Sequence, residues 1–280
     1  MPELPEVETI RRGLVGLIVG KKIVKVDVRN EKSWRGDVKS VIGARVVEVG
    51  RRGKALLIGL AGEDRLMVHL RMTGQLIYVG EERMAGGHPT EDFVGELPSK
   101  HTRVVFGLED GTHLYFNDQR KFGFVKVIGK GESDGFLDKL APEPWEMSEE
   151  EFFERLQKRK NTSTKAAILD QSVIAGVGNI YADEGLWAAG VAPMRKVGEI
   201  SLAEAEKLLV GIRKSMDKSL ETGGSSLKNY VKVDGARGDY LDKFAKVFNR
   251  TGKECERCGG IIEKTRVAGR GTHWCGSCQK

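Results

Sequence analysis

Apolar residues recur every three or four positions near the start of the chain, which is the spacing of one helix face. Val7, Ile10 and Leu14 carry this pattern. Pro5 suits the first helical turn, where its missing amide donor costs nothing. The spacing predicts a helix over residues 5–17.

Short runs of apolar or alternating character follow, separated by turn residues. Runs at this density are typical of an antiparallel β-sandwich or barrel. A polar, glycine-rich stretch at residues 80–101 interrupts them and is predicted to be a long surface loop. We expect the helix to pack at one end of the sheet. The predicted strands are residues 23–29, 44–49, 55–60, 66–70, 76–79, 103–108, 113–116 and 124–128.

Helical periodicity returns in the second half of the chain. Ser148 and Glu151 have the spacing of a capping box at a helix start. Further helices are expected within residues 166–220, and two glycines at 223–224 end the last of them. The fold class is therefore α+β, with an N-terminal antiparallel β-sandwich, a terminal helix and a helical domain. The predicted divisions are a sandwich at 1–130, a linker at 131–146, a helical domain at 147–222, a loop region at 223–248 and a cysteine element at 249–280.

The chain is basic and lacks the marks of a membrane or secreted protein. Its 280 residues include 46 basic and 40 acidic side chains, which gives a net charge of +6 and a pI of 9.0. This balance favours a polyanionic partner such as DNA, although a solvated basic surface would explain it equally well. No apolar run approaches the roughly 18 residues that span a bilayer, and no secretory leader precedes the helix. We therefore expect a cytoplasmic protein.

All four cysteines lie near the end of the chain in two Cys-x2-Cys pairs. Cys255 and Cys258 are separated from Cys275 and Cys278 by 16 residues. Two such pairs can hold one zinc ion tetrahedrally, and four sulfur ligands leave no open position for catalysis. Disulfides are the competing interpretation, which a reducing cytoplasm disfavours. The pattern predicts one structural Zn²⁺, with His273 as a surplus packing or surface residue.

The chain starts with a potential covalent catalyst. Removal of Met1 would leave the nitrogen of Pro2 as a secondary amine, which can form an iminium ion with an aldehyde-level carbon. Glu3 and Glu6 follow within one helical turn. Residues at a chain end are usually inert, so the motif needs support from the remaining sequence. A small second residue favours removal of Met1, and we expect the mature chain to begin at Pro2.

The segment at residues 2–9, PELPEVET, resembles the start of the formamidopyrimidine-DNA glycosylases, bacterial enzymes that remove oxidised purines from DNA. Further stretches match this family in the same order, so the resemblance spans nearly the whole chain. The matching stretches are Arg51–Lys54, His69–Gly74, Arg120–Gly123 and Gly176–Ala182, followed by the four cysteines.

The resemblance implies a catalytic set at the terminus. Pro2 is expected to attack the sugar, Glu3 to transfer protons and Glu6 to orient the terminus. Lys54 matches the family lysine that contacts the phosphate beside the lesion, and Arg270 matches the arginine of the zinc finger. The implied activities are glycosylase and abasic-site lyase, acting by β,δ-elimination through a Schiff base.

The resemblance also implies DNA contacts. Met72, Arg120 and Phe122 match residues that fill the space left when a base is flipped out of the duplex. Lys165 and Asn179 match phosphate-binding positions, the latter in a helix–two-turns–helix element. The family commonly has Asp-Pro before the arginine pair, whereas this chain has Asp118-Gln119. Residues 223–248 correspond to the lesion-recognition loop, and a zinc-ribbon hairpin would close the chain.

The leading hypothesis is thus a base-excision repair enzyme for 8-oxoguanine and formamidopyrimidines. Its partner would be double-stranded DNA with oxidised purines or abasic sites, and the enzyme would be a monomer associated with the nucleoid. One alternative is an endonuclease VIII-type glycosylase for oxidised pyrimidines. The other is a noncatalytic damaged-DNA binder, which the presence of Pro2, Glu3 and Lys54 argues against.

Overall fold

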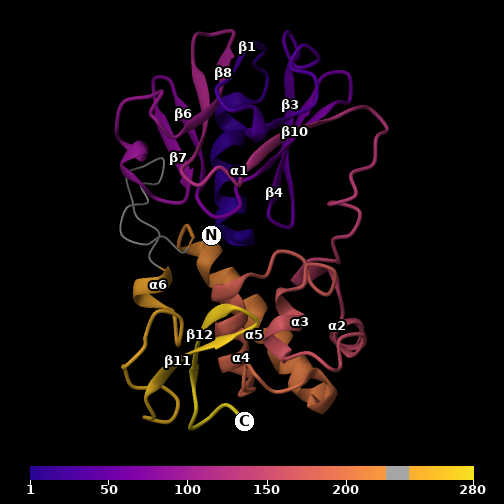
Figure 1. The fold of residues 1–280 in the computed structure, drawn as a ribbon, viewed down its shortest axis with the longest axis vertical. Coiled ribbons are helices and arrows are strands. Elements are labelled where there is room, and N and C mark those ends of the chain that lie inside the picture. Colours follow the sequence, from indigo (N-terminus) through magenta and orange to yellow (C-terminus); the bar gives the residue numbers. More distant parts are fainter. Residues whose placement is uncertain (225–239) are drawn as a thin grey trace. The chain divides into compact units, whose positions relative to one another are not determined.

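The computed structural model describes residues 1–224 and 240–280. The chain divides into two compact units. The N-terminal unit contains residues 1–138 and also residues 223–224, and the C-terminal unit contains residues 139–222 and 240–280. Figure 1 shows strands in the first and mainly helices in the second. The predicted lesion-recognition loop at 223–248 falls largely outside the described residues.

The N-terminal unit is a sandwich of two five-stranded sheets, which confirms the predicted fold class. One sheet has the order β1-β8-β9-β6-β7 and the other the order β2-β10-β5-β4-β3. Pairing is antiparallel except for β2 beside β10. The strands are β1 (Ile23–Val28), β2 (Trp34–Arg35), β3 (Val46–Arg52), β4 (Ala55–Leu60), β5 (Arg65–His69), β6 (Gly74–Val79), β7 (Arg83–Gly87), β8 (Thr102–Leu108), β9 (His113–Asp118) and β10 (Phe124–Ile128).

Helix α1 (Leu4–Ile18) closes the open side of the sandwich. It packs against β7 and β3, which are edge strands of the two sheets (Figure 1). Its apolar face, with Val7, Ile10 and Leu14 almost fully buried, joins the core between the sheets. A Cβ at Gly86 of β7 would lie 2.3 Å from Ile10, so glycine is required for this close approach.

The predicted long surface loop at residues 80–101 is instead partly ordered against the sheet. It contains β7 and a short 3-10 turn, η2 (Glu91–Phe93). Phe93 packs on Ile77 and Tyr115, which lie on the face of the sheet opposite the central core. The carboxylate of Asp92 accepts hydrogen bonds from Asn117 at 3.1 Å and contacts His101 at 2.9 Å. The segment therefore covers the outer face of the sheet.

The C-terminal unit consists of helices followed by a two-stranded hairpin. The predicted helix start at Ser148 is confirmed, and the last long helix ends just before Gly223, as expected. Ser148 accepts a hydrogen bond from the Glu151 amide at 3.2 Å. No described helix is both long and apolar enough to cross a membrane. The elements are α2 (Glu149–Gln157), α3 (Thr164–Leu169), α4 (Asn179–Ala189), α5 (Leu202–Glu221), α6 (Tyr240–Lys243), β11 (Ile262–Val267) and β12 (Arg270–Cys275).

Candidate functional site

The amino terminus is held in a fixed geometry by the first turn of α1. Glu3 is the N-cap, and its backbone amide donates to Glu6 Oε2 at 2.8 Å, while the Glu3 side chain accepts from the Glu6 amide. This reciprocal capping box orders both carboxylates. Pro2 is buried, and Glu3 is only 2% exposed. The capping box therefore places Pro2 directly before two ordered carboxylates.

A cluster of charges fixes the same helix to the sandwich. Glu8 accepts hydrogen bonds from Arg11 and Arg12 of α1 and from Arg51 of β3. Burial alone would raise the pKa of Glu8, but the three guanidinium groups outweigh it and lower that pKa to about 2. Glu8 thus remains ionised and ties the helix next to Pro2 to the edge of the second sheet.

Lys54 lies in the turn between β3 and β4 and is 8% exposed. The positive charges nearby act on His69, at the end of β5. Burial, together with the nearby charges of Arg71 and Lys54, lowers the pKa of His69 to about 3. The neutral ring accepts a hydrogen bond from the Arg71 amide at 3.1 Å and stacks on Phe124. Sequence reasoning did not assign His69 a role, although it begins one of the matching stretches.

Met72, Arg120 and Phe122, predicted to act together, are brought together in the structure. Arg120 Nη1 lies 3.1 Å from the Met72 sulfur. The guanidinium carbon of Arg120 lies 5.0 Å from the centre of the Phe122 ring. Phe122 is 56% exposed, whereas a phenylalanine side chain is more often buried. The apolar side chains of Met72 and Phe122 thus both lie beside the cationic group of Arg120.

The loop after β7 brings His88 close to the amino terminus. Burial lowers the pKa of His88 below its usual range, the positive charge of the chain's amino terminus lowers it further, and Asp118 opposes the shift. The His88 backbone amide donates to the Gly74 carbonyl, and the Gln75 side-chain Nε2 donates to the His88 carbonyl. No motif marked this histidine in the sequence, because its proximity to the terminus depends on the fold of the 80–101 segment.

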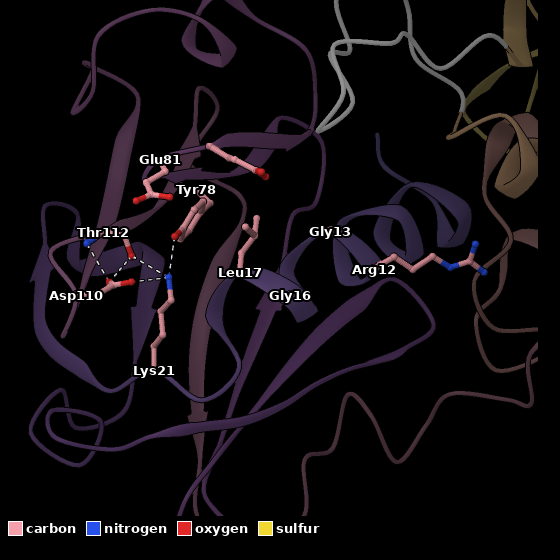
Figure 2. Close-up of a pocket in the computed structure, with 10 residues that line it drawn as sticks. Arg12, Gly13, Gly16, Leu17, Lys21, Tyr78, Glu81, Asp110 and Thr112 are labelled. Carbon is pink, nitrogen blue, oxygen red and sulfur yellow. Dashed lines mark hydrogen bonds and ion pairs between the residues drawn. The ribbon is translucent and has the colours of Figure 1, made fainter.

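A cleft elsewhere in this unit has its charges matched internally. It lies beside α1 and contains Lys21, Tyr78, Asp110 and Thr112 (Figure 2). Lys21 forms an ion pair with Asp110 at 2.6 Å and donates to the Tyr78 hydroxyl at 2.8 Å. Because the ammonium and the carboxylate neutralise each other, we assign this cleft no part in the chemistry.

In the C-terminal unit, the glycine-containing loop before α4 is fixed by one glutamine. The Gln171 side chain accepts from the Gly176 amide at 3.0 Å and donates to Val177 O at 3.0 Å. Gly178 rather than Asn179 is the N-cap of α4. The Asn179 amide group instead donates to the Gly271 carbonyl of the hairpin at 2.9 Å.

Lys165 occupies a different environment from the one predicted. Its side chain is fully buried and forms an ion pair with Asp183 of α4 at 2.6 Å. Its ammonium group also donates to Thr272 Oγ1 at 2.7 Å. The expected phosphate contact does not fit this arrangement, because all of these partners surround the ammonium group and exclude solvent. Lys165 is therefore a link between α3, α4 and the hairpin.

Arg270 is the first residue of β12 and is exposed. The two preceding residues, Ala268 and Gly269, have φ values of 51° and 73° and form the tight turn of the hairpin. Asn179 and Lys165 fix the backbone directly after Arg270. The guanidinium thus projects from a rigid turn, as a phosphate contact requires.

The four cysteines converge as predicted. Their sulfur atoms all lie within 4.8 Å of one another, with Cys255 3.8 Å from Cys278 and Cys258 3.5 Å from Cys275. The Trp187 indole donates to the Cys255 sulfur at 3.3 Å, the kind of outer contact that stabilises a bound thiolate. These four sulfurs fit one tetrahedral zinc ion.

His273 stands apart from this set. It packs edge-on against Phe248, and its backbone amide donates to Asp183 at 2.9 Å. It is 6% exposed, so of the two predicted environments, packing or surface, His273 occupies the packed one.

Comparison with known proteins decides the family. Residues 1–125 match the formamidopyrimidine-DNA glycosylase N-terminal domain, residues 140–231 match its H2TH domain, and residues 252–280 match a zinc finger found in FPG and IleRS. The chain is 38% identical to the formamidopyrimidine-DNA glycosylase of Pelotomaculum thermopropionicum, over 100% of this chain and 99% of that protein. It is 40% identical to that of Heliobacterium modesticaldum, over 100% of both. The chain belongs to the formamidopyrimidine-DNA glycosylase family.

Solved structures of the family agree with this assignment. The MutM (Fpg) protein of Thermus thermophilus is 37% identical with a TM-score of 0.85, covering 99% of this chain and 98% of that one. The Lactococcus lactis glycosylase, bound non-covalently to DNA with an AP site, is 31% identical with a TM-score of 0.86 over 100% of both chains. This member of the family is accordingly a DNA-binding repair glycosylase with a zinc finger that holds one structural zinc.

Proposed function

We propose that this glycosylase removes 8-oxoguanine and formamidopyrimidines from duplex DNA and then cleaves the strand at the abasic site. The observation that carries the proposal is the capping box that orders Glu3 and Glu6 next to Pro2. A Lactococcus lactis relative in complex with a Fapy-dG containing DNA, 32% identical to this chain, supports the substrate class. An abasic-site complex of the same relative supports the second step.

The proposed reaction begins at the Pro2 nitrogen. While Met1 is present this nitrogen belongs to the Met1–Pro2 peptide bond, so the amine exists only after Met1 is removed. The free amine attacks C1′ of the damaged nucleotide, and the bond to the base breaks with its electron pair leaving on the base. The attached nitrogen then gives up its proton, and the C1′–O4′ bond breaks with its electron pair and the proton going to O4′. This ring opening leaves an iminium ion between C1′ and the Pro2 nitrogen, which acidifies C2′. Loss of a C2′ proton expels the 3′ phosphate, and a second elimination expels the 5′ phosphate.

Glu3 is the proposed proton carrier for these steps. Its carboxylate lies one residue from the nucleophile and is shielded from solvent, which strengthens its effect on nearby charge. Glu6 orients the terminus, since it accepts the Glu3 amide. Lys54 is proposed to contact the phosphate beside the lesion, because its ammonium group can neutralise the negative charge of that phosphate.

The DNA contacts are proposed from exposure and geometry. Met72, Arg120 and Phe122 enter the space left by the flipped base, where Phe122 stacks and Arg120 pairs with the orphaned base. Arg270 grips a phosphate, and Asn179 supports it by fixing the Gly271 carbonyl. Lys165 contributes through the hairpin and not through a direct phosphate contact. We also propose that the enzyme works as a monomer on nucleoid DNA, in line with its basic charge.

Borohydride trapping tests the proposal. The purified protein is incubated with an 8-oxoguanine:cytosine duplex, with an oxidised-pyrimidine duplex and with undamaged DNA, and reduced adducts are counted. We expect a covalent adduct chiefly with the first duplex. Preference for the pyrimidine duplex would favour the endonuclease VIII-type alternative. Binding without any adduct would favour a noncatalytic binder.

A further inference from the structure

Two loops at one end of the sandwich carry the three side chains that project together. Residues 70–73 connect β5 to β6 and carry Met72, and residues 119–123 connect β9 to β10 and carry Arg120 and Phe122. Each loop passes from one sheet to the other, and the flanking strands pair with each other, β5 with β10 and β6 with β9. The loops are therefore neighbours whose relative position depends on contacts between them.

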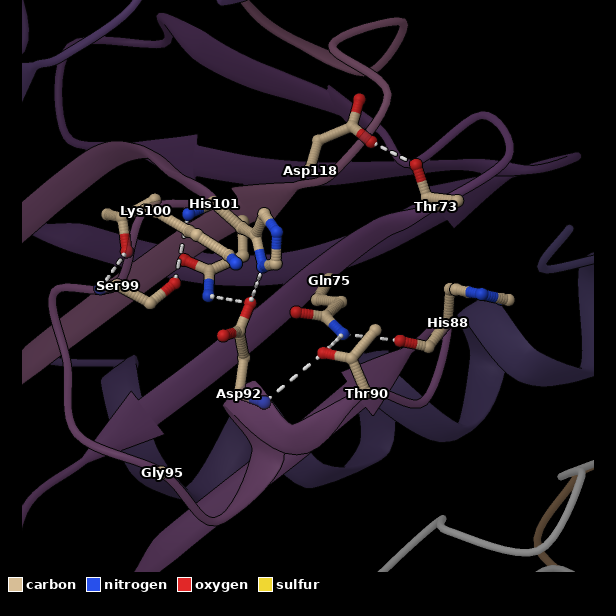
Figure 3. Close-up of polar contacts among 12 residues, drawn as sticks. Thr73, Gln75, His88, Thr90, Asp92, Gly95, Ser99, Lys100, His101 and Asp118 are labelled. Atoms are coloured by element: carbon tan, nitrogen blue, oxygen red, sulfur yellow. Dashed lines mark hydrogen bonds and ion pairs between the residues drawn. The ribbon is translucent and has the colours of Figure 1, made fainter.

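One carboxylate makes those contacts. Asp118 Oδ1 accepts the Thr73 hydroxyl (Figure 3) and also the Arg120 amide at 3.2 Å. Asp118 Oδ2 accepts the Gly123 amide at 2.6 Å. The Arg120 amide also reaches Thr73 Oγ1 at 3.0 Å, so the hydroxyl both donates to Asp118 and accepts from the other loop. Hydrogen bonds to an ionised acceptor are about twice as strong as neutral ones.

The carboxylate is itself held in place and shielded. Asp118 is 1% exposed and Thr73 is 8% exposed. The Asp118 carbonyl accepts from Arg103 Nε at 2.8 Å, and the Asp118 amide donates to the His101 carbonyl at 2.9 Å. Thus Asp118 is anchored on its backbone side while its side chain fixes both ends of the loop that follows.

The loop needs such support because its backbone is not regular. Lys121 has a φ of 59°, a left-handed conformation that a lysine adopts at some cost. Gln119 has no ring to restrict φ as a proline would. Without the carboxylate, the segment at 119–123 would gain conformational freedom and would have to be ordered when DNA binds.

We propose that Asp118 and Thr73 are positioning residues that lock the two loops together, so that Met72, Arg120 and Phe122 meet DNA as one preformed unit. Preorganisation of this kind removes the ordering cost from the binding step. The inference rests on the proposed function of these three side chains in base extrusion. It assigns no contact with the reacting sugar to either Asp118 or Thr73.

The test compares threonine variants at two positions. Thr73→Val keeps the shape of the side chain and removes the hydroxyl, and Thr73→Ser restores it. Thr102→Val is the matched control. Thr102 is also a buried threonine of this unit, and its hydroxyl accepts a hydrogen bond from the Ser99 backbone amide at 2.9 Å. It lies outside both loops. Two quantities are measured. The rate of base extrusion is monitored by the fluorescence of a 2-aminopurine placed next to 8-oxoguanine in the duplex. The yield of the borohydride-trapped adduct is measured on a single-stranded abasic oligonucleotide.

We expect Thr73→Val to slow extrusion by about tenfold, the effect of losing roughly 1.4 kcal/mol of buried hydrogen bonding. Thr73→Ser and Thr102→Val should extrude at the wild-type rate. A single-stranded abasic oligonucleotide has no opposite strand, so no base has to be extruded from a duplex. The yield of trapped adduct on this substrate should therefore be unchanged in all variants. Equal slowing in Thr73→Val and Thr102→Val, or wild-type extrusion in Thr73→Val, would overturn the inference.

Hydrogen exchange separates this inference from the proposed activity. The peptide covering residues 119–123 should exchange faster in Thr73→Val and in Asp118→Asn, which retains only one acceptor oxygen, than in the wild type or Thr102→Val. Unchanged exchange would refute the locking contact whether or not the protein is active. Failure of the wild type to trap any damaged duplex would refute the proposed function alone.

Discussion

The buried Lys165–Asp183 ion pair gives the sharpest energetic prediction. Lys165→Met would leave the Asp183 carboxylate fully buried without its 2.6 Å partner, and Thr272 Oγ1 would lose its donor at 2.7 Å. Removing one member of a buried pair typically costs about 3–5 kcal/mol. Asp183 keeps the hydrogen bond from the His273 amide, and its Oδ2 also lies 3.4 Å from His273 Nδ1, so we expect a loss of about 3 kcal/mol, the lower end of that range.

The double variant Lys165→Met/Asp183→Asn should recover much of this loss. It removes the uncompensated charge, while the asparagine oxygen can still accept the His273 amide, so we expect a net cost of about 1 kcal/mol. The assay is guanidinium unfolding of the zinc-loaded protein by tryptophan fluorescence. Three of the four tryptophans, at 145, 187 and 274, lie in the C-terminal unit and report on it.

DNA binding supplies the second half of this test. A lysine that contacts a phosphate contributes about 0.9 to the slope of log K against log salt. We expect the folded double variant to keep the wild-type slope, whereas Arg270→Ala should lower it by about 1. A single variant destabilised by less than about 1 kcal/mol, or a double variant with the slope of Arg270→Ala, would refute the buried-link account.

Three further predictions follow from the same structure. The pKa of Glu8 is about 2 in the folded protein against 4.5 ordinarily. Ionised Glu8 therefore stabilises the folded protein by about 3 kcal/mol above pH 4.5, and this stabilisation is lost as the pH falls towards 2. Glu8→Gln should remove this part of the acid dependence of unfolding, and an unchanged profile of unfolding against pH would contradict it. Chelation of zinc should lower the melting temperature and abolish DNA binding, and binding by verified metal-free protein would argue otherwise. Met72→Ala should slow base extrusion more than it weakens binding to undamaged DNA, as stopped-flow fluorescence and a binding titration would show; equal losses would speak against its void-filling role.

Elements with a helical period or a continuous apolar run were predictable from sequence. α1 shows a helical spacing of buried positions, and the strands at 55–60 and 124–128 are short, largely apolar runs. β7 was missed because two of its five residues are glycines, which disfavour strands unless a neighbour approaches closely. That neighbour is α1, whose contact with Gly86 depends on the tertiary fold.

The sites divide along a similar line. The zinc ligands could be predicted because the Cys-x2-Cys spacing is local, and the meeting of Met72 with Arg120 followed from a family resemblance. The burial of Lys165 could not be predicted from the sequence, because its partners Asp183 and Thr272 are 18 and 107 residues away along the chain. The interpretation of this lysine as a phosphate contact used its family match and had no information on what surrounds it.

The most direct test of the central claim identifies the atom that forms the covalent bond. The borohydride-trapped adduct with an abasic-site duplex is digested and sequenced by mass spectrometry, after intact-mass analysis has shown whether Met1 is present. We predict that the sugar is attached to the Pro2 nitrogen of chains that lack Met1. Attachment at Lys54 or another lysine, or an equal yield from chains that retain Met1, would contradict the account.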